Sequence, residues 1–337
     1  MRAVVRKIDV RSQSLQKAGA EIIVADMYDY EQMTAALKGT KRAYFCPPVQ
    51  LFMIHAASVF SVVAREAGLE YIAGLSQWLA SPQHPSLHTR QLWLVENLFS
   101  TIPGVSSTVV NPGAFADTFL QPLPAAAQLG VYPNAFGSHK NAPPSNEDIA
   151  KVIVGCLMDP NTHAGKRYRP TGPHLLSIHD MAATIGRVVG RDLKVQDVSL
   201  NVFFKSARAS GFSEFEITST QHYLADGRLN AFEIHAPTTD VLEVSGEPAE
   251  TFEETVKRYA ATMPGVSRTQ ANKIKAIGET IKILATRPYD LERYERTQER
   301  PKASTPELAS HSAQWLDEHR TNEGWSSPDV VGALKME

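Results

Sequence analysis

The sequence has few cysteines, no long apolar run and almost no net charge. Only two of its 337 residues are cysteine, which indicates a reducing compartment and no disulfide framework. No run reaches the roughly 18 apolar residues of a membrane-spanning helix, and the basic start MRAVVRKIDVR lacks the apolar segment of a signal peptide. The formal net charge of -2 gives no electrostatic reason to bind nucleic acid or an anionic membrane. We therefore expect a soluble cytoplasmic protein that binds neither directly.

Two phosphate-binding motifs are also missing. Neither G-x-G-x-x-G nor the spacing of a P-loop occurs anywhere in the chain, so the usual phosphate fingerprint is absent. The cysteines and histidines form no cluster with metal-ligand spacing, and we predict no metal site.

The first 26 residues nevertheless have the pattern of a nucleotide-binding unit. Two β-branched runs, at about 3–6 and 22–25, flank a segment with helical spacing at about 12–18. This is the second half of a βαβ unit, whose first half would be an apolar strand, a glycine-rich turn and a helix start that binds pyrophosphate. We hypothesise that the chain is an incomplete version of a longer protein. Alternatively, another segment takes the place of the missing strand, or strands 3–6 and 42–46 pair with each other.

Strands and helices alternate through the following residues. We predict strands at about 41–46, 71–78 and 106–110 and helices at about 29–38, 52–67 and 90–99. This alternation predicts an α/β fold, a doubly wound Rossmann-like parallel sheet that lacks its first strand. Our division has three parts: a Rossmann-like domain at 1–144, a smaller mixed substrate subdomain at 145–265, and a helical, partly disordered extension at 266–337. The extension has predicted helices at 270–284 and 306–319.

Polar residues mark the starts of several predicted helices. Asp29 is a candidate N-cap for the helix that follows it, and Asn146 for the helix from 147 to 158. Ser177 and Asp180 have the spacing of a capping box.

The order and spacing of several segments resemble the NmrA-like family of atypical short-chain dehydrogenases/reductases. The resemblance runs from about residue 2 to residue 260 and leaves the extension unmatched. The segments that carry it are RAVVRK, GAEIIVAD, MTAALKGTKRAYFCPP, HTRQLWLVENLF, TVVNPGAFADTF, EDIAKVI, GKRYRPTGPHLLSIHDMAATI and EETVKRYA. It implies a Rossmann fold that binds NAD(P), and an oxidoreductase activity.

The resemblance also implies which residues meet the cofactor. Arg6 would bind the 2′-phosphate of NADP, helped by Lys7 and by Ser12 or Ser14, because a guanidinium forks onto phosphate oxygens. NADP (NADPH) is therefore expected more than NAD, although a solvated basic turn would have the same sequence. The other implied contacts are Asp26 and Met27 at the adenine, Cys46, Pro47 and Pro48 at the end of a strand, and Asn111, Pro112, Gly113, Ala114 and Phe115 near the nicotinamide.

Three of these residues have a specific interpretation. We interpret Cys46 as a small buried hydrophobe rather than a nucleophile, since no base is identifiable beside it. In the turn from 111 to 115, Gly113 would supply unusual backbone freedom, and Phe115 would offer a ring face to the nicotinamide. A plain strand-ending turn is the alternative for this segment.

Ser76 and His88 are the candidate catalytic residues. Active members of the wider superfamily pair a tyrosine with a lysine four residues later, and no tyrosine in this chain has lysine at that spacing. Ser76 lies where the superfamily binds a substrate carbonyl, and His88 lies near the altered catalytic motif of the family. Histidine can donate a proton near neutral pH, although His88 could equally cap the helix or bind the nicotinamide ribose.

Three hypotheses about function follow. The first is an NAD(P)H-dependent reductase of a small apolar carbonyl, quinone or imine. The second is a non-catalytic NAD(P)-sensing regulatory protein that acts through a protein partner, and the third is a truncated family member that binds no dinucleotide. A small-molecule substrate is the expected partner, and a protein partner or a homodimer is possible.

Overall fold

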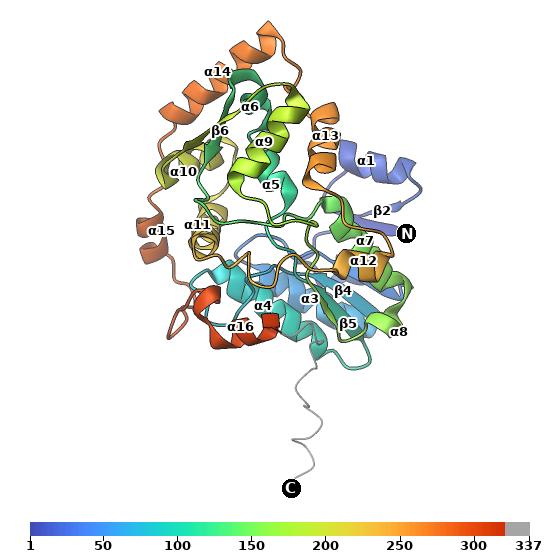
Figure 1. The fold of residues 1–337 in the computed structure, drawn as a ribbon. Coiled ribbons are helices and arrows are strands. Elements are labelled where there is room, and N and C mark those ends of the chain that lie inside the picture. The colour runs from blue at the N-terminus through green and yellow to red at the C-terminus, as the bar shows by residue number, and fades with distance from the viewer. Residues whose placement is uncertain (321–337) are drawn as a thin grey trace.

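The computed structural model describes residues 1–320, in which parallel strands alternate with helices (Figure 1). The strands are β1 (Arg2–Val5), β2 (Glu21–Val24), β3 (Arg42–Phe45), β4 (Tyr71–Leu75), β5 (Ser106–Val110), β6 (Val131–Asn134), β7 (Arg167–Tyr168) and β8 (Lys194–Asp197). The helices of the first 200 residues are α1 (Val10–Lys17), α2 (Tyr30–Leu37), α3 (Met53–Glu66), α4 (Leu87–Ser100), α5 (Ala116–Leu120), α6 (Leu123–Leu129), α7 (Asn146–Met158), α8 (Pro160–His163) and α9 (Ile178–Val189). The later helices are α10 (Leu200–Ala209), α11 (Glu214–Arg228), α12 (Asp240–Ser245), α13 (Phe252–Thr262), α14 (Gln270–Ala285), α15 (Leu291–Thr297), the 3-10 turn η1 (Ala309–His311) and α16 (Ala313–Arg320).

The main sheet has four parallel strands in the order β3-β4-β5-β7. In β4 the side chains alternate between two apolar clusters, because successive residues of a strand point to opposite faces. Tyr71 and Ala73 pack against residues of α7, whereas Ile72 belongs to the cluster that includes residues of α3 and α4. Both faces are therefore covered by helices, as the run of apolar residues in this strand predicts.

β1 and β2 form a separate two-stranded parallel sheet. The sequence predicts a parallel sheet that lacks its first strand, and in residues 1–320 the parallel strands form separate sheets. The predicted alternative in which strands 3–6 and 42–46 pair is wrong, because β1 pairs only with β2 and β3 pairs only with β4 in these residues. Within this range no segment pairs with the remaining edge of either strand.

A smaller layer of helices surrounds a third sheet in residues 1–320, the parallel pair β6 and β8. Its apolar core joins α5, α6, α9 and α13 (Figure 1). The sequence pattern does not indicate β6, because the segment from 116 to 136 has no clean period and Pro133 lies within the strand.

Three predicted helix starts can be compared with the structure. Asp29 caps α2, and Ser177 and Asp180 form the capping box of α9, which confirms both predictions. The prediction of Asn146 as an N-cap is wrong. Ser145 is the cap, with extended backbone and a hydroxyl that accepts the N–H of Asp148 at 3.0 Å, and Asn146 is the first residue of α7.

Residues 270–320, from α14 to α16, run along one side of the molecule, and we call them the strap. α14 packs on α6 and α10, and α15 packs on α11. The chain then continues to α16 (Figure 1), which packs on the loop that follows β4. There the indole N–H of Trp315 donates to the carbonyl of Trp78 at 2.9 Å, and both indoles are buried. The disorder predicted for the extreme end lies outside the described residues.

None of the helices in residues 1–320 is both long and apolar enough to cross a membrane. No group of three or more His, Cys, Asp and Glu side chains in this range could hold a metal ion.

Candidate functional site

The carboxyl ends of β1 and β2 bring the predicted adenosine-binding residues together. The register pairs Val5 with Val24, so Arg6 and Lys7 leave β1 next to the point where Asp26 leaves β2. The side chains of these three residues are exposed, and neither Arg6 nor Lys7 makes an ion pair within residues 1–320. Met27 is half-buried against the core of the large domain. Two cations without an ion-pair partner and one carboxylate therefore lie at the exposed carboxyl end of this two-stranded sheet.

The first backbone N–H groups of α1 already have an acceptor and are not free to bind a phosphate. The carboxylate of Asp9 accepts the backbone N–H groups of Arg11 and Ser12 at 3.0 and 3.1 Å. Arg11 also donates to it, and these bonds lower the pKa of Asp9 to about 2, so the group stays ionised. Ser12, predicted as a helper of Arg6, donates and accepts within this cap instead.

The start of α3 differs from the start of α1. α3 begins after Phe52, which gives no side-chain cap, and Phe52 is 66% exposed. The backbone N–H of Met53, the first residue of α3, donates to the carbonyl of Gln50 at 3.2 Å. The next N–H groups of a helix without a side-chain cap need another acceptor. Of the helices that follow β1, β2, β3 and β4, only α3 lacks a side-chain cap.

Cys46, Pro47 and Pro48 follow β3, as predicted. Pro47 is buried and Pro48 is half-buried. The prediction of a buried Cys46 is wrong, because its side chain is exposed at the unpaired edge of β3. Partial desolvation by the surrounding chain raises the pKa of the thiol, so the nucleophilic thiolate is disfavoured.

Ser76 and Asn111 leave the ends of β4 and β5 and meet at one buried carboxylate. The Ser76 hydroxyl donates to Oε1 of Glu96, and Nδ2 of Asn111 donates to the same oxygen at 2.7 Å. The other oxygen, Oε2, forms an ion pair with Arg167 at 2.8 Å, and Glu96 is 2% exposed. Such a paired network fixes its members, because unpaired buried groups are costly. Sequence analysis missed Glu96, which sits in an amphipathic helix like any other acid.

The turn after β5 is buried rather than open. Asn111, Pro112, Gly113 and Ala114 are buried, and Phe115 is half-buried against residues of α7. Gly113 does not have a positive φ, so the predicted reason for glycine at this position is wrong. A Cβ at Gly113 would meet Trp78 and Phe232 at 3.9 Å, which is ordinary contact.

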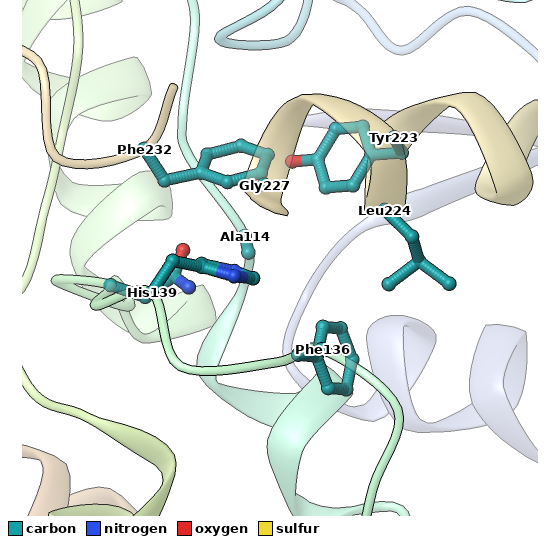
Figure 2. Close-up of a pocket in the computed structure, with 8 residues that line it drawn as sticks. Ala114, Phe136, His139, Tyr223, Leu224, Gly227 and Phe232 are labelled. Atoms are coloured by element: carbon teal, nitrogen blue, oxygen red, sulfur yellow. The ribbon is translucent and has the colours of Figure 1, made fainter. Parts of the chain in front are cut away.

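A small cavity lies beside Ala114 (Figure 2). Its volume is about 10 Å³, roughly the space of one water molecule. Figure 2 shows the rings of His139 and Phe232 facing it, with Tyr223 beside Phe232. Gly227 allows this closeness, since a Cβ there would lie 2.9 Å from the His139 imidazole. Sequence analysis missed His139, for which the pattern carries no signal.

His88 does not reach Ser76 through any hydrogen bond in residues 1–320. Its ring lies edge-on to Phe215 with 6.3 Å between ring centroids, and its buried Nδ1 has no partner within these residues. Burial, with a smaller effect of His84, lowers the pKa of His88 to about 4. The imidazole is therefore neutral at pH 7, and the predicted donation from a charged imidazole near neutral pH has no support.

His84 and Asp226 form a second buried pair that sequence analysis missed. Nδ1 of His84 accepts the backbone N–H of Ser86, so the neutral ring carries its proton on Nε2 and donates it to Asp226 at 2.6 Å. Both side chains are fully buried. The backbone N–H of Ser310 donates to the other oxygen of Asp226, at 3.2 Å. This pair joins the loop after β4, α11 and the strap.

The curated proteins that this chain resembles are reductases and dehydrogenases. No protein-family model matches the chain. The NAD(P)H azoreductase of Xenophilus azovorans is 26% identical over 258 residues, which are 74% of this chain and 86% of that protein. Quinone oxidoreductase 2 of Escherichia coli is 23% identical over 75% of this chain and 87% of its own. The triphenylmethane reductase of a Citrobacter species, solved with NADP(H), superposes with a TM-score of 0.65 at 20% identity, over 76% of this chain and 89% of that one.

The chain has the α/β fold of NAD(P)-binding Rossmann-like reductases. The structural match shows this, and it extends over about three quarters of the chain. In such folds ligands bind at the carboxyl ends of the strands, where Arg6, Ser76 and Asn111 lie.

Proposed function

We propose that this protein is an NAD(P)H-dependent reductase of quinones, azo compounds or related apolar acceptors. The observation that carries the proposal is the similarity, over about three quarters of the chain, to an NAD(P)H azoreductase and a quinone oxidoreductase. A reduced nicotinamide supplies a hydride when it is bound. The chain's own residues have to hold the two ends of the dinucleotide and position the acceptor.

NADP rather than NAD is the cofactor in this proposal. Arg6 and Lys7 are exposed cations at a strand end and are not engaged by any acid in residues 1–320. Two such cations suit a 2′-phosphate, onto which the guanidinium of Arg6 can fork. At the other end, Asn111, Pro112, Gly113, Ala114 and Phe115 would border the nicotinamide, and Asp26, Met27 and residues 46–48 would border the rest of the cofactor.

The pyrophosphate of the cofactor needs N–H donors, which a glycine-rich turn supplies in many nucleotide-binding folds and which this sequence does not offer in such a turn. We propose that the uncapped first turn of α3 provides them, because the start of α1 is already filled by Asp9. Phe52→Asp tests this assignment. The new carboxylate would lie at the first turn of α3, repel a bound pyrophosphate and weaken NADPH binding. NADPH affinity that is unchanged in this variant would remove α3 from the proposal.

Ser76 and His88 enter the proposal with different roles. Because the Ser76 hydroxyl donates to Glu96, we assign it to positioning Glu96 and Asn111 rather than to proton donation. His88 is neutral at pH 7, so we assign protonation of the product to water, with His88 as a neutral N–H donor at most. A Ser76→Ala, His88→Gln double variant that retains the wild-type kcat would remove both residues from the proposal.

The decisive experiment is oxidation of NADPH in the presence of 1,4-naphthoquinone or an uncharged azo dye. We expect consumption that depends on the acceptor, with a KM for NADPH about tenfold higher in Arg6→Ala and a KM for NADH little changed. Arg11→Ala is the matched control, because Arg11 is an exposed arginine in the same segment whose side chain is engaged by Asp9. No oxidation, together with no thermal shift on adding NADP⁺, would refute the proposal, since a ligand that binds only the folded state must stabilise it.

A further inference from the structure

A cleft of about 470 Å³ lies between α11, α15, the start of α4 and the segment 300–306 of the strap. Figure 1 shows α15 beside α11, on the side of the molecule that the strap follows. This volume is within the range of sites that bind small organic molecules. The cleft contains none of the residues assigned above to the dinucleotide.

Two side chains in the walls of the cleft have buried polar atoms without partners. Thr218 on α11 is 5% exposed, and its hydroxyl makes no hydrogen bond within residues 1–320. Nε and Nη2 of Arg300 are also buried and unbonded in this range. Leaving buried donors unpaired is costly, and native proteins rarely do so. An acceptor placed in the cleft would satisfy both residues.

The guanidinium of Arg300 is held between two aromatic rings. Its central carbon lies 4.3 Å from the ring centroid of Tyr294 and 5.5 Å from that of Phe215. These contacts fix the plane of the guanidinium and leave its edge for hydrogen bonding. The edge of a fixed guanidinium matches two oxygens of a carboxylate or sulfonate, and the rings give the adjoining wall an apolar character.

Two carboxylates and four cationic side chains line the cleft. Glu292 lies 3.6 Å from Arg296, and Glu295 lies 3.2 Å from the ring of His222. Burial lowers the pKa of His222, so this imidazole does not offset the charge of Glu295. Because the cations outnumber the carboxylates, the cleft keeps a net positive charge.

Three further cations of the cleft, Arg90, Arg300 and Lys302, have no carboxylate partner within residues 1–320. Arg90 donates to the backbone carbonyls of residues 84, 85 and 301, which leaves its charge in place. Neither Arg300 nor Lys302 makes an ion pair within residues 1–320. We propose that this cleft binds an organic anion with an aromatic body, whose carboxylate or sulfonate is held by Arg300 and Thr218.

The test uses two fluorescent probes of similar shape. 8-Anilinonaphthalene-1-sulfonate carries the sulfonate, and N-phenyl-1-naphthylamine lacks it. We expect the sulfonate to bind with a Kd that rises about tenfold in Arg300→Ala, and saturating NADP⁺ to leave this Arg300-dependent component unchanged. Arg293→Ala, which removes an exposed arginine of α15 outside the cleft, should bind as the wild type does.

Thr218→Val supplies a second measurement that does not depend on how Arg300→Ala folds. It removes the unpaired hydroxyl at nearly constant shape, so we expect an equal or higher Tm and weaker sulfonate binding. Sulfonate binding that is unchanged in both variants would overturn the proposal. So would equal affinity for the uncharged probe, or loss of the Arg300-dependent component on adding NADP⁺. Because the cleft shares no residue with the dinucleotide site, failure here would leave the reductase proposal standing.

Discussion

β4 and β1 are both short parallel strands of apolar residues, yet their surroundings differ. β4 pairs on both edges, and Tyr71, Ile72 and Ala73 are 0% exposed. Within residues 1–320, β1 pairs on one edge only, and Val4 on β1 and Val24 on β2 are 39% and 52% exposed. Burial on both faces, rather than composition, therefore distinguishes the two sheets. The four-stranded sheet should carry most of the stability, and the two-stranded sheet should contribute little.

The largest expected difference concerns an ion pair next to each sheet. Glu96→Gln should cost about 3 to 5 kcal/mol, because it leaves the buried charge of Arg167 without a counter-ion. Glu21→Gln removes the partner of Arg2 in an exposed pair, and its cost should be about 0 to 1 kcal/mol. Urea denaturation of both variants measures the difference. Equal costs would show that the two sheets are not distinguished by burial.

The second comparison uses apolar side chains. Ile72→Ala in β4 should destabilise by about 3 kcal/mol, since a fully buried isoleucine leaves a cavity. Val24→Ala in β2 should cost under about 1 kcal/mol, because half of that side chain is already in water. Thermal unfolding of the two variants is the measurement. A large loss in Val24→Ala would mean that the two-stranded sheet is covered in solution.

The third effect is a pH dependence on the side of the four-stranded sheet, and it is the smallest at pH 7 because it appears only in acid. The pKa of His88 is about 4 in the folded protein and about 6.5 in the unfolded chain, so the unfolded chain binds the proton first. Its contribution to stability is complete above pH 6.5 and is lost as the pH falls toward 4. His88→Gln should therefore flatten the fall of Tm over this window. His55→Gln, at an exposed histidine of α3, should leave the profile unchanged.

The elements that sequence patterns predicted were those whose signal is local. β4, α3 and the caps at Asp29 and Ser177 follow from apolar period and from side chains that bond their own backbone. Local patterns left open how the strands on either side of the missing first strand are paired, because pairing depends on which strand edges find partners across the fold. β6 was not predicted for the same reason. It contains Pro133, and only its pairing with β8 defines it as a strand.

The same difference between local signals and contacts with distant residues applies to the candidate site. The strand ends placed Arg6, Ser76 and Asn111 correctly at the carboxyl edges of the sheets. The bonds that fix Ser76 and Asn111 come from Glu96, which is on a helix and has no motif around it. Likewise, the exposure of Cys46 reflects the unpaired edge of β3, a property that no local pattern carries.

Asp226 bonds two segments that are distant in sequence, and this affects the order in which the chain folds. It joins His84, which is 142 residues away in sequence, and the backbone of Ser310, which is 84 residues away. During synthesis Asp226 can meet His84 early, but its second oxygen must wait until the strap has emerged. Contacts between such distant residues form slowly, because loop closure comes first. The last part of the structure to be completed is therefore the layer over the ends of β4 and β5, where the nicotinamide-binding turn is proposed.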